Sequence, residues 1–134
     1  MALAHWIREH TAHDAVLYGG GFGLVGFFAD RAWINADGVV NTANYQQVLE
    51  SGDLVGYLAR NRVDFAVQFR DPVESAPGRV AVEVPGALHE IRVVLSLPED
   101  AVIHATRFGE RAPDREVVVV RFDPTRARAV RRPW

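Results

Sequence analysis

The spacing of the hydrophobic residues changes at Asp71-Pro72, and this change limits what the chain can fold into more than any other feature of the sequence. Upstream of it, short apolar runs alternate with segments in which apolar residues recur at helical spacing. Downstream, apolar residues occupy every second position, as Val80, Val82 and Val84 do, and this is typical of strands with one buried face. The sequence therefore predicts strand-helix units followed by antiparallel strands.

The first half predicts helices and strands in alternation. Leu3, Trp6 and Ile7 share one face of a helix over residues 2–11 because their spacing matches the helical repeat. Short apolar runs predict strands over 15–18, 32–35 and 63–69. Capping residues favour helices over 43–50 and 54–60, and residues 22–29 can hold about two helical turns. This alternation favours parallel strands joined by right-handed crossovers.

The second half predicts strands over residues 79–84, 91–97, 101–108 and 116–122, which we expect to extend the same sheet in antiparallel fashion. The last nine residues carry four Arg and no acid. Such a segment can lie against an anionic membrane surface, but a solvated, unstructured end is the usual outcome. The 134 residues form one domain, 1–134. The predicted fold class is α/β: a small Rossmann-like layered sheet with parallel N-terminal strands and helices, extended by antiparallel C-terminal strands.

Charge and composition exclude several classes of function. The formal net charge is −2, so no overall positive field gathers nucleic acid, and we expect no nucleic-acid partner. Cysteine is absent and every basic residue is Arg, which excludes thiolate and lysine Schiff-base chemistry. His5 and His10 are five positions apart, whereas a helical metal pair needs four, so no metal is expected. No serine lies in a nucleophile-elbow motif, and we expect no catalytic residue.

Gly21, Gly23 and Gly26 form a G-x-G-x-x-G pattern between a predicted strand and a predicted helix. In dinucleotide sites this pattern lets a pyrophosphate approach the backbone at a helix N-terminus. Here the helix is short, and Asp37 follows Gly21 by only 16 residues, where about 20 is usual. The glycines can instead permit close packing of the helix on a strand. We therefore expect no cofactor, and a small nucleotide-binding protein that uses Gly21 to Gly26 is the alternative.

One longer segment has a more specific pattern. It reads G-F-F-A-D-R-A-W-I-N-A-D-G-V-V-N over residues 26–41, followed by Tyr45, by Leu54 to Leu58 and by Arg62-Val63-Asp64-Phe65. With the opening W-I-R at residues 6–8, this order resembles the soluble C-terminal region of bacterial polytopic membrane proteins related to the GT-C glycosyltransferases. The resemblance covers about residues 3–70. Ala29 and Ala36 depart from it, because that family's pattern has Ser and Leu at these places.

The resemblance implies an accessory role rather than catalysis, because that family's catalytic carboxylate belongs to an extracytoplasmic loop between membrane helices, outside the matched region. The implied partners are the membrane-embedded portion of the chain's own parent and the head group of a lipid-linked sugar or acceptor, at the extracytoplasmic face of the bacterial cell membrane. Asp and Asn side chains also shape turns, so a purely structural interaction module is a further alternative. The candidate binding or loop-structuring residues are Asp30, Asn35, Asp37, Gly38, Asn41 and Tyr45.

Overall fold

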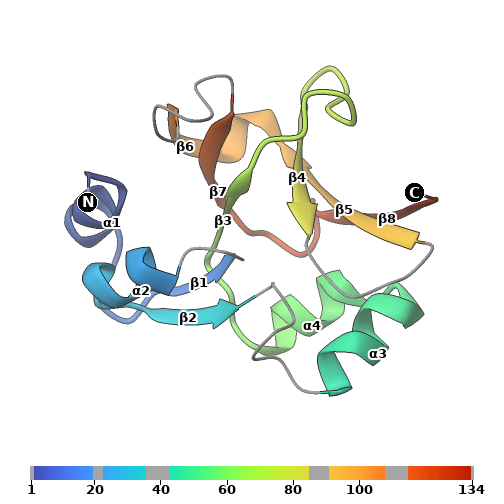
Figure 1. Ribbon diagram of the computed structural model, residues 1–134, viewed down its shortest axis with the longest axis horizontal. Helices are drawn as coiled ribbons and strands as arrows, with labels where there is room; N and C mark the ends of the chain where they lie inside the picture. The colour runs from blue at the N-terminus through green and yellow to red at the C-terminus, as the bar shows by residue number, and fades with distance from the viewer. Residues whose placement is uncertain (1, 20–22, 36–42, 85–90, 108–114, 134) are drawn as a thin grey trace.

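The computed structural model describes residues 2–19, 23–35, 43–84, 91–107 and 115–133, and Figure 1 shows their arrangement. The helices are α1 (Ala2–His10), α2 (Gly23–Ala29), α3 (Ala43–Ser51), α4 (Leu54–Arg60) and the 3-10 turn η1 (Glu99–Ala101). The strands are β1 (Val16–Gly19), β2 (Ala32–Asn35), β3 (Phe65–Phe69), β4 (Arg79–Val84), β5 (Ile91–Pro98), β6 (Val102–Arg107), β7 (Glu116–Arg121) and β8 (Arg128–Pro133). Apart from β8 and the turn η1, whose bounds were not predicted, these bounds agree with the predicted ones to within two residues.

A five-stranded mixed sheet has the order β2-β1-β3-β7-β6. β1 runs parallel to both β2 and β3, while β7 is antiparallel to β3 and to β6. The chain moves from β1 outward to β2 and then back across β1 to β3. Because these two crossovers run in opposite directions, right-handed connections place their helices on opposite faces of the sheet. The mixed α/β character that the sequence predicted is thus confirmed.

Two hydrophobic cores lie on the two faces of this sheet. On one face, Leu17 and Val67 pack with Ile7 of α1 and Val25 of α2. The other core joins Tyr18 and neighbouring sheet residues to the buried side chains of α3 and α4 and of strands β4 and β5. The molecule therefore has three layers, with α1 and α2 outside, the five-stranded sheet in the middle, and α3, α4 and the remaining strands beyond it (Figure 1).

β4 and β5 do not extend the five-stranded sheet, and on this point the sequence prediction is wrong. They form a separate antiparallel sheet of order β4-β5-β8, linked to β3 by the isolated bridge between Arg70 and Val82. The alternating valines correctly predict one buried face. That face, which includes Val82 and Leu95, packs against the face of the first sheet, whereas the prediction had these strands paired to its edge. The Arg-rich end, expected to be unstructured, supplies β8, and Arg132 pairs there with Glu74 at 3.2 Å.

Candidate functional site

Of the six candidate residues predicted from the resemblance, the structure describes Asp30, Asn35 and Tyr45, and these three do not meet at one place. Asp37, Gly38 and Asn41 lie outside the described residues. Asp30 precedes β2, whereas Asn35 ends that strand opposite Gly19 of β1, so the two lie at opposite ends of β2. Asp30 is exposed with φ of 54°, the left-handed conformation that ends helices. Its observed role is therefore to end α2.

Arg31, which follows Asp30, joins the ends of α1 and α2. Its guanidinium donates to the carbonyl oxygens of Arg8 at 2.9 Å, Thr11 at 3.0 Å and Ala29 at 3.3 Å. These carbonyls belong to the last turns of the two helices or follow them, where no intrahelical donor reaches. Arg31 thus serves the fold, and its positive charge is directed to backbone oxygens.

Tyr45 is buried on the opposite face of the sheet from α2. Its hydroxyl lies 2.8 Å from the hydroxyl of Tyr18, which is also buried, and its ring packs at 5.7 Å against Tyr57. Burial, and then the neighbouring Tyr45, raise the pKa of Tyr18 well above its ordinary value. The Tyr18 hydroxyl therefore stays protonated at neutral pH, and the described contacts make Tyr45 a core residue.

Gly26 allows α2 to lie directly on the indole ring of Trp33. A β-carbon at Gly26 would come within 3.1 Å of that ring, and Trp33 Nε1 is itself held by the carbonyl of Gly19 at 3.1 Å. Gly23 is the first residue of α2, which has seven residues, and Gly21 lies outside the described residues. Close packing therefore accounts for Gly26 of the glycine pattern.

Gln68 is a buried polar residue of β3 that the sequence did not single out. It is 2% exposed, and its side-chain oxygen accepts the N–H of Phe69 at 2.9 Å. Its Nε2 has no hydrogen-bond partner, the single such atom among the buried side chains that the structure describes. An unpaired buried amide costs on the order of 1–3 kcal/mol, so Gln68 is a weak point of the core.

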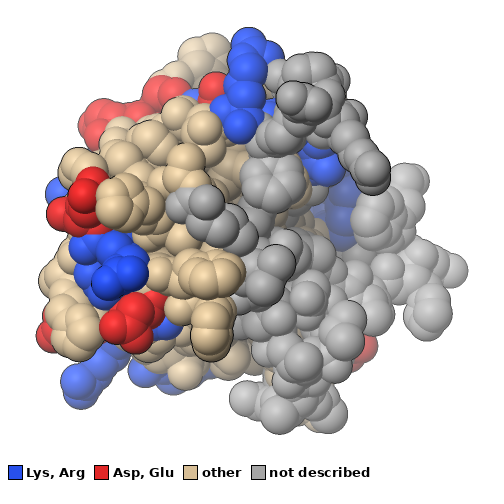
Figure 2. Space-filling model, turned by 60° about the vertical axis from the view of Figure 1, so that its left-hand side comes forward, with Lys and Arg blue, Asp and Glu red and all other residues tan. Residues whose placement is uncertain are grey.

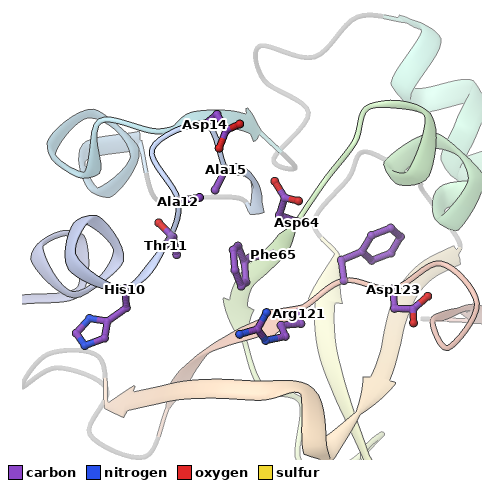
Figure 3. A pocket seen from close by; sticks show the side chains of 10 residues that line it. His10, Thr11, Ala12, Asp14, Ala15, Asp64, Phe65, Arg121 and Asp123 are labelled. Atoms are coloured by element: carbon purple, nitrogen blue, oxygen red, sulfur yellow. The ribbon is translucent and has the colours of Figure 1, made fainter.

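A pocket of about 580 Å³ opens at the amino-terminal ends of β1 and β3. Four segments line it: the end of α1, the loop to β1, the start of β3, and the end of β7 with the residues after it (Figure 3). The volume lies within the range of small-molecule sites, roughly 300–1,000 Å³. The lining residues that carry polar or charged side chains are His10, Thr11, Asp14, Asp64, Arg121 and Asp123.

Two of these carboxylates are fixed by backbone donors. Asp64 Oδ2 accepts the N–H of Val16 at 2.8 Å, and its backbone also bonds to Val16 and Phe122, so Asp64 ties β1, β3 and β7 together. Asp123 accepts both the hydroxyl and the N–H of Thr125, at 2.7 and 2.9 Å. Those two bonds, led by the one from the hydroxyl, lower the pKa of Asp123 below its ordinary value. Asp123 is therefore ionised at neutral pH.

Asp14 and Arg121 are held less firmly. Arg121 lies with its guanidinium carbon 5.8 Å from the centre of the Phe65 ring, a long cation–π contact. Among the residues that the structure describes, no carboxylate forms an ion pair with Arg121, and Asp14 makes no hydrogen bond or ion pair. Both side chains are exposed at the pocket and available to a ligand.

His10 at the rim belongs to a stack of three rings. The Trp6 ring lies between His10, at 4.5 Å, and His104 of β6, at 4.2 Å. Burial, and then the neighbouring His10, lower the pKa of His104. Within the described ranges, no three His, Asp or Glu side chains are placed to hold a metal ion. His10 and His104 thus make aromatic contacts with Trp6, and His5 lies 3.0 Å from Glu9.

The outer surface of α1 and α2 carries an exposed aromatic pair. Phe27 is 77% exposed and Phe28 is 49% exposed, and their rings meet edge to face at 5.3 Å. Phe28 also borders a shallow hollow of about 180 Å³ with Ala4, His5 and Arg8. Figure 2, turned toward the side of α1 and α2, shows separate acidic and basic groups around uncharged surface.

Comparisons with known proteins give no relative: no family model, no curated protein and no solved structure matches the chain. No helix within the described residues is both long and apolar enough to span a bilayer.

Sequence reasoning missed the pocket because its residues come from four separate segments. The one local signal is Asp123-Pro124-Thr125, a turn in which the Asp side chain is expected to accept backbone N–H groups. That turn motif predicts the conformation of Asp123, but it does not indicate that Asp14 and Arg121 line the same pocket as Asp123.

Proposed function

We propose that this chain is a non-catalytic accessory domain of an integral-membrane protein related to the GT-C glycosyltransferases, placed on the extracytoplasmic face of the bacterial cell membrane. In this role it covers the active site of the membrane-embedded portion of its parent or positions the acceptor. The sequence resemblance over residues 3–70 suggests the parent. The observation that supports a membrane-surface position is the exposed pair Phe27 and Phe28.

Adjacent exposed phenylalanines are unusual on a protein that works free in water, since exposed apolar patches mark contact surfaces. Phe27 and Phe28 project from α2 beside Arg8 of α1, which lines the hollow next to Phe28. Aromatic rings that enter the interfacial region of a bilayer and a neighbouring arginine that meets lipid phosphate are a recurrent combination. We infer that this face rests on the membrane next to the parent's helices.

The size of this contact suits orientation rather than anchoring. Burying two partly exposed Phe side chains contributes roughly 1–2 kcal/mol each, and one Arg near anionic lipid adds about 1 kcal/mol. The sum, about 3–5 kcal/mol, gives marginal, reversible membrane binding, comparable to or weaker than that of a single acyl chain. Attachment to the parent chain would supply the rest.

The test is co-sedimentation of the chain with large vesicles containing anionic lipid. We expect weak, saturable binding that the double variant Phe27→Ser, Phe28→Ser abolishes. Val73→Ser is the matched control, because Val73 is 87% exposed in the loop between β3 and β4. Absence of binding by the unmodified chain, or equal binding by the double variant, would overturn the membrane contact.

The parentage has a separate test. Translation of the gene upstream of the Ala2 codon is expected to reveal several hydrophobic spans of about 20 residues each. A start codon without such spans would contradict the proposed membrane-protein parent. Binding to vesicles would then indicate that the chain is a peripheral membrane protein.

A further inference from the structure

The pocket at the amino-terminal ends of β1 and β3 has a charge pattern that selects among ligands. Three carboxylates and one guanidinium line it, those of Asp14, Asp64, Asp123 and Arg121. The C-terminal end of α1 also faces it through His10 and Thr11, and helix C-termini carry partial negative charge. This excess of negative charge disfavours nucleotides and other polyanions, and it favours a ligand that carries a cation.

The single cation is separated from two of the carboxylates. Figure 3 shows Asp14 and Asp64 toward one end of the pocket and Arg121 toward the other, with the Phe65 ring between them. The free oxygen of Asp64 is positioned by the bond from Val16 N–H to its other oxygen. A ligand that satisfies both ends needs a positive group at one end and a negative group at the other.

We propose that this pocket binds a small zwitterion of the amino-acid type, with its ammonium group at Asp14 and Asp64 and its carboxylate at Arg121. The methylene chain of such a ligand lies along the Phe65 ring. This inference is independent of the proposed membrane contact, because Phe27 and Phe28 line no part of the pocket.

Arg121 suits the carboxylate because its fork of N–H donors matches two carboxylate oxygens. The guanidinium carbon lies 5.8 Å from the centre of the Phe65 ring, which places these donors beside the ring that the methylene chain would follow. Asp14 suits the ammonium because it makes no ion pair within the described part of the chain, so ligand binding breaks no existing contact of that carboxylate.

The experiment compares three probes of one length: 5-aminopentanoate, pentylamine and pentanoate. The full chain is titrated with each at constant ionic strength and followed by amide chemical shifts in two-dimensional NMR. We expect saturable shifts at Asp14, Asp64 and Arg121 with 5-aminopentanoate, with binding about fivefold tighter than that of pentylamine, the upper end for a partly exposed charge pair. Pentanoate is expected not to saturate. Equal affinities for 5-aminopentanoate and pentylamine, or no saturation by either, would overturn the proposal.

The variants separate the two ends. Arg121→Gln is expected to lower the affinity for 5-aminopentanoate to that for pentylamine and to leave pentylamine unchanged, while Arg121→Lys restores part of the difference. Asp14→Asn is expected to weaken both amines. Arg115→Gln is the matched control, because Arg115 stacks on Phe69 at the other end of β3. The same loss in Arg115→Gln as in Arg121→Gln would show a nonspecific charge effect and contradict the site.

Discussion

The two ends of β3 carry similar residue types in opposite situations. At the carboxyl end, Arg70 is held by Glu99 at 2.9 and 3.1 Å and by Glu116 at 2.8 Å. The hydrogen bond from Arg70 to Glu99 contributes most to raising the pKa of Arg70. Asp71 accepts two backbone N–H groups and pairs with Arg92 at 3.2 Å. The described charges at this end are matched within the fold.

At the amino end, the Asp64 side chain accepts a single backbone N–H, and among the described residues no carboxylate forms an ion pair with Arg121. The carboxyl-end charges join the two sheets, since Asp71 N–H bonds to Ala81 of β4 and Arg92 belongs to β5. The difference teaches which charges serve folding and which are available for binding. In this domain the available charges lie at the edge opposite to the one where ligands of open α/β sheets usually bind.

The largest effect is expected at the carboxyl end. Asp71→Ala removes the acceptor of two N–H groups and leaves Arg92 without one of its partners, so we expect a loss of about 2–4 kcal/mol in the free energy of unfolding. Urea unfolding followed by circular dichroism measures it. Asp14→Ala, at the amino end, is the control and is expected to change stability by less than about 0.5 kcal/mol. Similar losses in both variants would remove the distinction between the two ends.

The buried tyrosines extend the comparison to the face of the sheet. Tyr45→Phe leaves the Tyr18 hydroxyl without its 2.8 Å partner, and we expect a loss of about 1–3 kcal/mol in the free energy of unfolding. In a double-mutant cycle, Tyr18→Phe together with Tyr45→Phe is expected to cost less than the sum of the single changes, because no hydroxyl is then left unpaired. Strict additivity would show that the two hydroxyls do not interact.

The contact between α2 and Trp33 tests how tightly the carboxyl end of β1 is packed. Alanine at position 26 gains about 1 kcal/mol of helix propensity, but its methyl group would press on an indole ring that the bond to Gly19 holds in place. We expect Gly26→Ala to destabilise by about 1 kcal/mol net. In a Trp33→Leu background the same change should become stabilising. Thermal unfolding of the chain with and without Gly26→Ala, in each background, measures this reversal of sign. A stabilising effect in both backgrounds would contradict tight packing.

The sequence predicted the elements well because local spacing and end signals determine them. The helix over Leu54–Arg60 matches its predicted bounds, and Gly52 has the left-handed φ of 78° expected at a helix end. The division into two sheets was not predictable, because the alternation of Val80, Val82 and Val84 indicates a buried face without indicating what covers it. β8 was missed because its arginines read as solvated, whereas Arg132 finds Glu74 across the fold.

The candidate site depends on tertiary contacts more than the helices and strands do. Among the candidates that the structure describes, Asp30 lies at the amino end of β2, Asn35 at the carboxyl end of that strand, and Tyr45 in the core. The pocket depends on tertiary contacts between Asp14, Asp64 and Arg121, which are separated by more than 40 residues at each step. No local pattern encodes that proximity.

The smallest expected effect is a pH dependence at the amino end, where the ring stack includes His10 at the pocket rim. Burial of His104 and then the nearby His10 lower the pKa of His104 in the folded state below the 6.5 of the free side chain. As pH falls through 6.5, the unfolded chain binds this proton first, so the free energy of unfolding decreases below about pH 7. The slope stays well under about 1.4 kcal/mol per pH unit, because one partly buried group is involved.

His104→Phe is the variant that isolates this slope. Phenylalanine keeps a ring stacked on Trp6 but binds no proton, so urea unfolding at pH 7.5, 6.5 and 5.5 is expected to show a flatter dependence than in the unmodified chain. His13→Gln, at an exposed position outside the stack, is the control and is expected to retain the slope. If His104→Phe retains the full slope and His13→Gln loses it, the titrating group is not in the stack. The amino end would then owe its sensitivity to an exposed loop rather than to the contact between α1 and β6.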